Sequence, residues 1–101
     1  MSEDAVEPEQ ARPWRAEDGP RPRVQTWPSS ERPALWVWSC GAWRWARVVA
    51  RQDWPDGRIA YQVEIDAAGT TSVSTRAYWW PQSGLRVARS PNARSLSDLT
   101  V

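Results

Sequence analysis

The sequence predicts a small all-β domain over residues 34–89, and three observations support this fold class. From Leu35 onward, short apolar runs are broken by turn signals about every eight to twelve residues, which is typical of an all-β meander. No window of useful length has the period of an amphipathic helix. Seven of the nine tryptophans lie between Leu35 and Arg89, so this stretch holds most of the large side chains available to build a small core.

The first two strands are expected to form a tight hairpin. The first strand covers residues 35–39, the turn is Cys40-Gly41, and the second strand covers about residues 43–50. Glycine accepts the positive φ that such a turn requires. On the second strand, alternation favours an inward-facing set of small residues and an outward-facing set rich in tryptophan. The inward set is Ala46, Val48 and Ala50, and the outward set is Trp43, Trp45, Arg47 and Val49. Trp36 and Trp38 share one face of the first strand, and the alternation of side chains alone does not decide whether that face points inward or outward.

Three further strands follow the segment Trp54-Pro55-Asp56-Gly57, which is the clearest turn in the chain. The third strand, at residues 58–66, alternates cleanly, so its core face is Ile59, Tyr61, Val63 and Ile65. The fourth strand, at about residues 71–78, is rich in Thr and Ser, and its two faces do not separate. After an irregular or 3₁₀ turn over residues 79–84, a fifth strand at residues 85–88 directs Leu85 and Val87 inward.

The two ends of the chain differ from the domain in composition. Residues 1–33 hold six prolines and seven acidic residues against five arginines, a net charge of −2. Such a segment buries too little apolar area to offset its ordering entropy, so we expect a disordered or extended arm. Trp14 and Trp27, each beside a proline, are either docking anchors or incidental. Residues 90–101 are expected to be a flexible tail.

The composition argues against several classes of protein. Cys40 is the only cysteine, so no disulfide can form within the chain. The acidic N-terminus does not resemble a signal peptide, and no apolar stretch approaches the roughly 18 residues that span a bilayer. We therefore expect a soluble, cytoplasmic protein without membrane contact. The absence of histidine, of zinc-ligand spacing and of a phosphate-binding glycine loop predicts that the protein is not an enzyme and holds no metal or cofactor.

The five strands together resemble a Tudor-like domain, a small, strongly bent, five-stranded antiparallel barrel. The resemblance covers about residues 35–89 and is most specific at Val37-Trp38-Ser39-Cys40-Gly41 and Trp45-Ala46-Arg47-Val48-Val49. Ligand-reading members of that family hold methylated Lys or Arg in an aromatic cage. The resemblance implies that Trp38 lies where one cage wall would be. Arg44 stands where a second aromatic is expected, and residues 66–70 contain no aromatic, so a complete cage is not expected.

Seven tryptophans and two tyrosines are too many for the interior of so small a domain, because each aromatic buries about 150–250 Å². Several must be partly exposed. The predicted partner-binding surface is Trp38, Trp45, Arg47, Arg76, Tyr78 and Trp80. A structural role is the alternative for each residue: Trp43 and Trp45 plug the barrel end, Trp79 belongs to the core, and Trp54 clamps its turn.

Two functions fit this surface. The first is a non-catalytic adaptor that binds a protein or peptide, because Trp, Tyr and Arg dominate interface energetics. The second is binding of single-stranded nucleic acid, with bases stacked on the aromatic rings and arginines on the phosphates. Capture of a methylated side chain by a partial cage is a third reading, which Arg44 disfavours.

Overall fold

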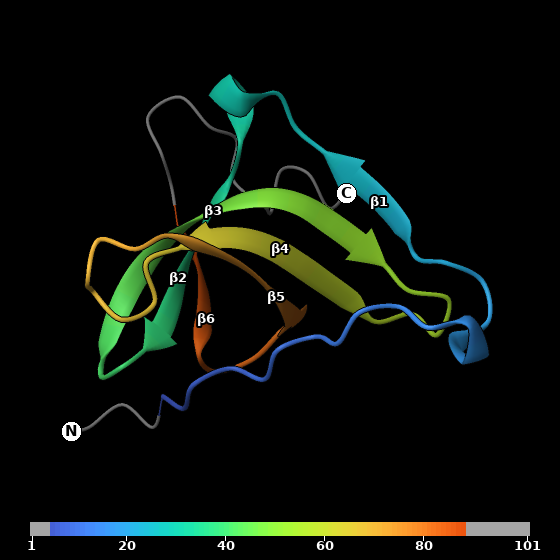
Figure 1. The fold of residues 1–101 in the computed structure, drawn as a ribbon, viewed down its shortest axis with the longest axis horizontal. Helices are drawn as coiled ribbons and strands as arrows, with labels where there is room; N and C mark the ends of the chain where they lie inside the picture. Colours follow the sequence, from blue (N-terminus) through green and yellow to red (C-terminus); the bar gives the residue numbers. More distant parts are fainter. Residues whose placement is uncertain (1–4, 89–101) are drawn as a thin grey trace.

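The computed structural model describes residues 5–88 and confirms the all-β prediction (Figure 1). Its strands are β1 (Arg23–Thr26), β2 (Ala34–Ser39), β3 (Ala42–Asp53), β4 (Ile59–Ile65), β5 (Ser74–Trp80) and β6 (Leu85–Ala88). Within residues 5–88, helix is limited to two single 3₁₀ turns, η1 (Ala16–Asp18) and η2 (Ser29–Glu31). Arg89 and the tail expected at residues 90–101 lie outside the described residues.

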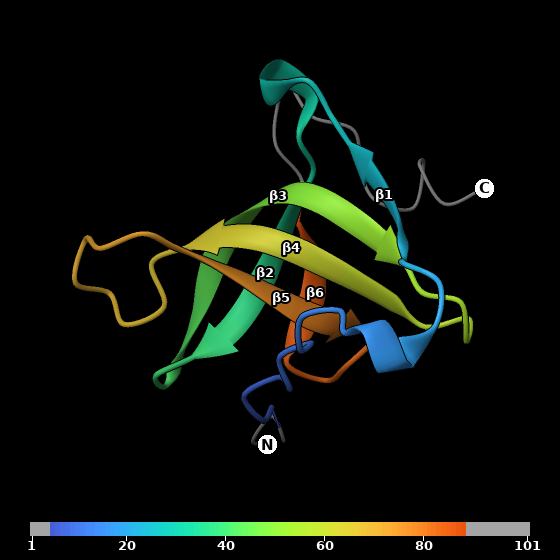
Figure 2. The same cartoon turned by 45° about the vertical axis from the view of Figure 1, so that its right-hand side comes forward.

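The strands form one antiparallel sheet in the order β5-β4-β3-β2-β6, with β1 paired to β3. The sheet curls around its core, and β2 and β6 cross behind β4 and β5 (Figures 1 and 2). Strands β2 to β6 correspond to the five strands expected from the sequence. The five-stranded barrel itself is not confirmed, because the sheet has six strands and β5 is not paired with β6.

Strand β3 is long enough to pair with two strands along one side. Its first half pairs with β2, and its second half pairs with β1, where Thr26 lies opposite Ala50. Between Val48 and Ala50 the register with β4 shifts, which leaves Val49 as the extra residue of a β-bulge. A bulge bends a strand and increases its twist, so this residue marks where the sheet curls.

The core lies inside the curl and is built from residues of β2 to β6 and the arm. Its main cluster is Trp27, Leu35, Val37, Ala46, Val48, Tyr61, Val63, Ile65, Ala67, Tyr78 and Leu85. The predicted core face of the third strand is confirmed, with Ile59 packed against this cluster. Ala46 and Val48 are buried as predicted; Ala50 is buried too, but beyond the bulge it lies opposite Gln62 rather than a core residue. Val87 was expected to face inward and is instead 40% exposed, because β6 is the outermost strand of the sheet.

The hairpin turn between β2 and β3 has the predicted form. Ser39 pairs with Ala42, so the loop contains two residues, Cys40 with φ of 50° and Gly41 with φ of 78°. Positive φ at both positions is the signature of a type I′ turn, whose twist matches that of the flanking strands. The turn after β3 also forms as expected, with the Gly57 N–H donating to the Trp54 carbonyl at 3.0 Å.

Residues 5–33 run as extended chain along the sheet, and β1 is a strand that the sequence analysis did not predict (Figures 1 and 2). Near its start, the arm lies against the edge of β5. The Ala11 N–H donates to the Ala77 carbonyl at 2.8 Å, and the Gln82 side chain bonds both the N–H and the carbonyl of Glu9, at 2.7 and 2.9 Å. Because an unpaired edge strand invites pairing with other chains, the arm protects β5.

A glycine allows the arm to dock this closely. A Cβ atom added to Gly84 would collide with the Val6 carbonyl oxygen and would lie 2.8 Å from Pro8 Cδ. The Val6 contact is with backbone, which cannot rotate away as a flexible side chain can. Close approach of two backbones is therefore the physical reason for glycine at this position.

We expect Gly84→Ala to displace the start of the arm from the edge of β5. Hydrogen exchange of the Ala11 and Trp79 amides, which bond across this junction, should become faster. Ser83→Ala, at an exposed neighbouring position, serves as the control and should leave both rates unchanged. Equal protection in the Gly84→Ala and Ser83→Ala variants would contradict the docking described here.

The turn around η1 should respond to acid. The pKa of Asp18 is lowered from 3.8 to about 2, first by the hydrogen bonds from the Arg12 side chain and then by the backbone N–H of Arg15. Because the folded pKa is the lower one, the stabilisation is present above about pH 3.8 and is lost as the pH falls toward 2. An NMR titration of the Arg15 amide should show a midpoint near pH 2, and Asp18→Asn should abolish that transition. A midpoint near 4 would mean that Arg12 and Asp18 are not paired.

Candidate functional site

Four tryptophans lie on the outer face of the β2–β3 hairpin. The register pairs Trp38 with Trp43 and Trp36 with Trp45. The intervening residues of β2, Leu35 and Val37, are fully buried, so alternation directs the indoles away from the core. We call Trp36, Trp38, Trp43 and Trp45 the tryptophan face.

The tryptophan face is held in place by ring contacts. Trp38 and Trp43 meet edge to face with centroids 5.4 Å apart, and the Arg86 guanidinium lies 4.3 Å above the Trp43 ring. Trp36 and Trp45 are the open members, with 40% and 42% of their surfaces exposed. Trp36, Trp43 and Arg86 line a shallow pocket of about 220 Å³. Trp38, Trp43 and Arg86 are therefore held in a fixed arrangement, and Trp36 and Trp45 present open ring surface beside them.

Charged residues border the Trp45 end of this face. Trp45, Arg47, Glu64, Asp66 and Val73 line a second hollow of about 270 Å³. The Glu64 carboxylate pairs with Arg32 at 3.6 Å, and the Asp66 carboxylate accepts two backbone N–H groups of its own turn, at 3.0 and 2.8 Å. The Arg47 side chain has no hydrogen bond or ion pair with any other residue in the range 5–88. Among the charged side chains that line this hollow, Arg47 is therefore the one without a partner in that range.

The structure divides the predicted binding residues between two faces of the sheet. Trp38, Trp45 and Arg47 lie on the outer face of β2 and β3. Arg76, Tyr78 and Trp80 share the other side of β5, since Tyr78 pairs with the core residue Tyr61. They do not form one surface with the tryptophan face.

Tyr78 and Trp80 require correction as members of an exposed surface. Tyr78 is only 2% exposed and belongs to the core, and Trp80 packs against the same cluster, with its ring 5.7 Å from that of Tyr61. Trp79 was expected in the core and lies on the opposite face, 5.3 Å from Trp54 and under the Arg58 guanidinium. The two tryptophans exchange the roles predicted for them because the faces of the fourth strand could not be told apart from its sequence.

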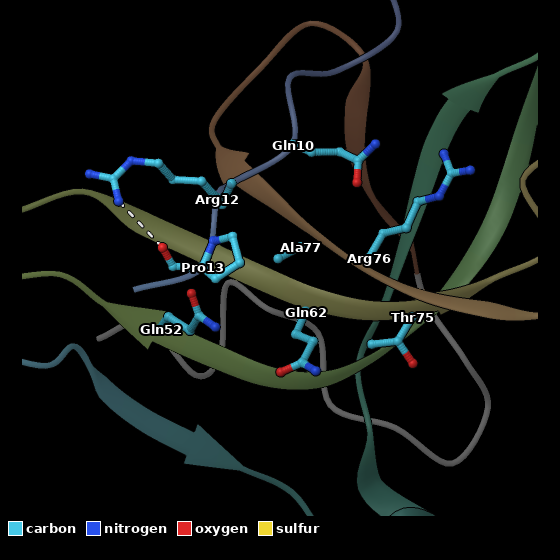
Figure 3. A pocket seen from close by; sticks show the side chains of 9 residues that line it. Gln10, Arg12, Pro13, Gln52, Gln62, Thr75, Arg76 and Ala77 are labelled. Atoms are coloured by element: carbon cyan, nitrogen blue, oxygen red, sulfur yellow. Dashed lines mark hydrogen bonds between the residues drawn. The ribbon is translucent and has the colours of Figure 1, made fainter. Parts of the chain in front are cut away.

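Arg76 lies beside a polar hollow between the arm and the sheet (Figure 3). The hollow has a volume of about 370 Å³, and its floor includes the small side chain of Ala77. Figure 3 shows Gln52, Gln62 and Thr75 along the sheet and Gln10 and Pro13 on the arm. The glutamine carboxamides and the Thr75 hydroxyl that line the hollow can form hydrogen bonds, but they supply no strong base or nucleophile.

The sequence analysis left Trp36, Trp43 and Arg86 out of the predicted binding surface, although it placed Trp43 on the outward face of its strand. A signal for the first two was present, because a two-residue loop at Cys40-Gly41 requires Trp38 to pair with Trp43 and Trp36 with Trp45. No comparable signal marks Arg86, whose place beside Trp36 depends on the long-range pairing of β6 with β2.

The two positions compared with cage walls, Trp38 and the position held by Arg44, do not face one another. Arg44 lies opposite Val37, on the inner face of the hairpin, and donates to the carbonyls of Ser39 and Cys40 at 3.1 and 3.3 Å. Trp38 lies on the outer face, so these two side chains do not enclose a common space. Within residues 5–88, no group of three or more His, Cys, Asp or Glu side chains is placed to hold a metal ion. The same residues include no helix of the length and apolarity needed to cross a membrane.

Comparisons of the chain with protein-family models, with curated proteins and with solved structures gave no match. The functional argument therefore depends on the site itself.

Replacing single aromatics should separate core from surface. Tyr78→Ala removes a buried ring and should lower the free energy of unfolding by about 3–5 kcal/mol. Trp45→Ala removes one member of an exposed cross-strand pair and should cost about 1 kcal/mol or less. Urea denaturation of both variants measures the difference. A loss for Trp45→Ala as large as that for Tyr78→Ala would show that Trp45 is a core residue.

Proposed function

We propose that this protein is a non-catalytic binding module that holds a protein or peptide partner on the tryptophan face. One observation carries the proposal: four indoles stand together on one sheet face, two of them at least 40% exposed. Scattered exposed apolar residues are normal on a protein surface, whereas a contiguous aromatic group is typical of an interaction site. Tryptophan and arginine are also the residues that most often dominate binding energy.

Rigidity supports the proposal. Ordering a side chain on binding costs about 0.5–1.5 kcal/mol, and a surface already held in place avoids that cost. Trp38 and Trp43 are fixed against each other, and Arg86 is stacked on Trp43. This part of the tryptophan face is thus preorganised before a partner arrives.

The arm leaves this face uncovered. It contacts the edge of β5, Gly84 and the second half of β3, and it reaches the surroundings of this face only through Glu7 at the Cys40 N–H and Arg32 at Glu64. The arm is acidic and proline-rich, yet it does not cover Trp36 and Trp45, which remain open. An intramolecular role in holding the arm therefore does not account for the tryptophan face.

The charge pattern favours a protein partner over single-stranded nucleic acid. Either partner could stack on the exposed indoles, but a nucleic acid also needs a row of cations for its phosphates. Arg86 and Arg47 border the tryptophan face singly, and the hollow at Arg47 is also lined by Glu64 and Asp66, so the described residues around this face offer no row of cations. Mixed charge around an aromatic centre is the pattern of a protein interface.

The test is selection of peptides from a random display library on the immobilised chain. We expect selected peptides to lose at least tenfold in affinity for Trp36→Ala/Trp45→Ala, which removes both open indoles. Val24→Ala, which removes an apolar side chain 60% exposed on β1, should bind them normally. Binding that survives the double substitution would refute the proposal. Oligonucleotide binding that quenches tryptophan fluorescence and weakens steeply with salt would establish the nucleic-acid function instead.

A further inference from the structure

We propose that the tryptophan face selects an extended, proline-containing peptide that also carries a carboxylate, which binds Arg47. The inference depends on the proposed function and specifies its ligand. Three features carry it: the position of the indoles on a sheet face, the pocket between Trp36 and Trp43, and the Arg47 guanidinium, which has no partner among the described residues.

The four indoles of the site lie on β2 and β3, which are interior strands of the sheet, and Arg86 comes from the outermost strand β6. Strands β2 and β3 are both hydrogen-bonded to neighbours, so their backbone groups are not available to pair with an added strand. The edge of β5 already holds the arm. A ligand on the tryptophan face therefore needs a backbone that requires no partner strand, and polyproline II has a fully solvated backbone without internal hydrogen bonds.

The pocket suits proline. Its walls are two indoles on diagonally placed positions of adjacent strands, with the Arg86 side chain as the third wall. Aromatic-lined grooves recognise proline-rich segments because the pyrrolidine ring is apolar and the segment is ordered before it binds. A shallow pocket of about 220 Å³ leaves room for a compact ring and none of the depth that a long aliphatic side chain needs.

Arg47 supplies the preference for a carboxylate. The two acidic residues nearby already have partners, Glu64 in the Arg32 side chain and Asp66 in backbone N–H groups of its own turn, so neither pairs with Arg47. Arg47 is exposed and without a partner among residues 5–88, and its planar guanidinium binds a carboxylate through two parallel hydrogen bonds.

The ligand has two subsites, the pocket for proline between Trp36 and Trp43 and the Arg47 guanidinium for the carboxylate, and strand geometry gives the spacing between them. Trp43 and Arg47 are four residues apart on β3, which corresponds to about 13 Å. Polyproline II rises about 3.1 Å per residue, so the acidic residue should stand about four positions from the proline. Peptides with Glu next to Pro should not satisfy both subsites.

The domain already binds a segment of this chemistry at a neighbouring place. In the arm, Pro8 packs against Gly84, and the Glu7 carboxylate accepts the Cys40 N–H at 2.9 Å, at the turn of the same hairpin. An acidic, proline-containing segment is therefore compatible with the surface adjoining the tryptophan face.

The experiment uses the full chain and synthetic peptides in which Pro and Glu are four residues apart, in either order, with affinity measured by tryptophan fluorescence. A peptide with Pro and Glu in at least one of the two orders should bind. In that peptide, replacing Pro by Ala, replacing Glu by Gln, or moving Glu beside Pro should each weaken binding roughly tenfold. Arg47→Gln should abolish the preference for Glu over Gln and keep the preference for Pro. Arg58→Gln, an exposed arginine over Trp79 outside the tryptophan face, should keep both preferences.

Several results would overturn the inference. If Glu→Gln in the peptide weakens binding equally for the wild type and Arg47→Gln, Arg47 does not bind the carboxylate. If neither order binds while library-selected peptides still require Trp36 and Trp45, the ligand class is wrong and the proposed function stands. If no peptide depends on those tryptophans, the inference about the ligand and the proposed function both fail. Self-association of the chain that is lost in Trp36→Ala/Trp45→Ala would assign the face to a second copy instead.

Discussion

The two-residue turn at Cys40-Gly41 is the constraint on which the rest of the structure depends. Its type I′ geometry fixes the register of β2 against β3. That register places Leu35 and Val37 in the core and brings the indoles of the tryptophan face together on the outside. A slip of one residue would turn every side chain of one strand to the other face, so the same turn determines both the core and the site.

Around this hairpin, the rest of the chain bends the sheet and protects its edges. The bulge at Val49 bends β3, so that its second half accepts β1 while its first half pairs with β2. The arm covers the edge of β5, and Gly84 permits the close backbone approach that this requires. A domain of this size has a small core, and these contacts with the arm add buried surface that the five central strands do not provide alone.

The sequence predicted the elements that depend on local patterns and missed those that depend on distant pairing. Clean alternation identified β4 and its core face, and glycine turns identified the hairpins. Strand β1 has only four exposed residues in a proline-rich segment, so its pairing with β3 left no local signal. Tyr78 was misplaced because β5 mixes Thr, Ser and aromatic residues on both faces, and only its register with Tyr61 decides which face is buried. Of the six predicted site residues, Trp38 and Trp45 belong to the tryptophan face and Arg47 borders it.

The central claim is that Trp36 and Trp45 stand open on the outer face while other tryptophans are enclosed. Incorporation of 5-fluorotryptophan gives one ¹⁹F NMR signal for each of the nine tryptophans, assigned by single Trp→Phe substitutions. With a soluble paramagnetic reagent, the signals of Trp36 and Trp45 should broaden most, and those of Trp27 and Trp54, 9% and 6% exposed, should broaden least. Equal protection of Trp36, Trp45 and Trp27 would contradict the account, because it would place the indoles of the hairpin inside the protein.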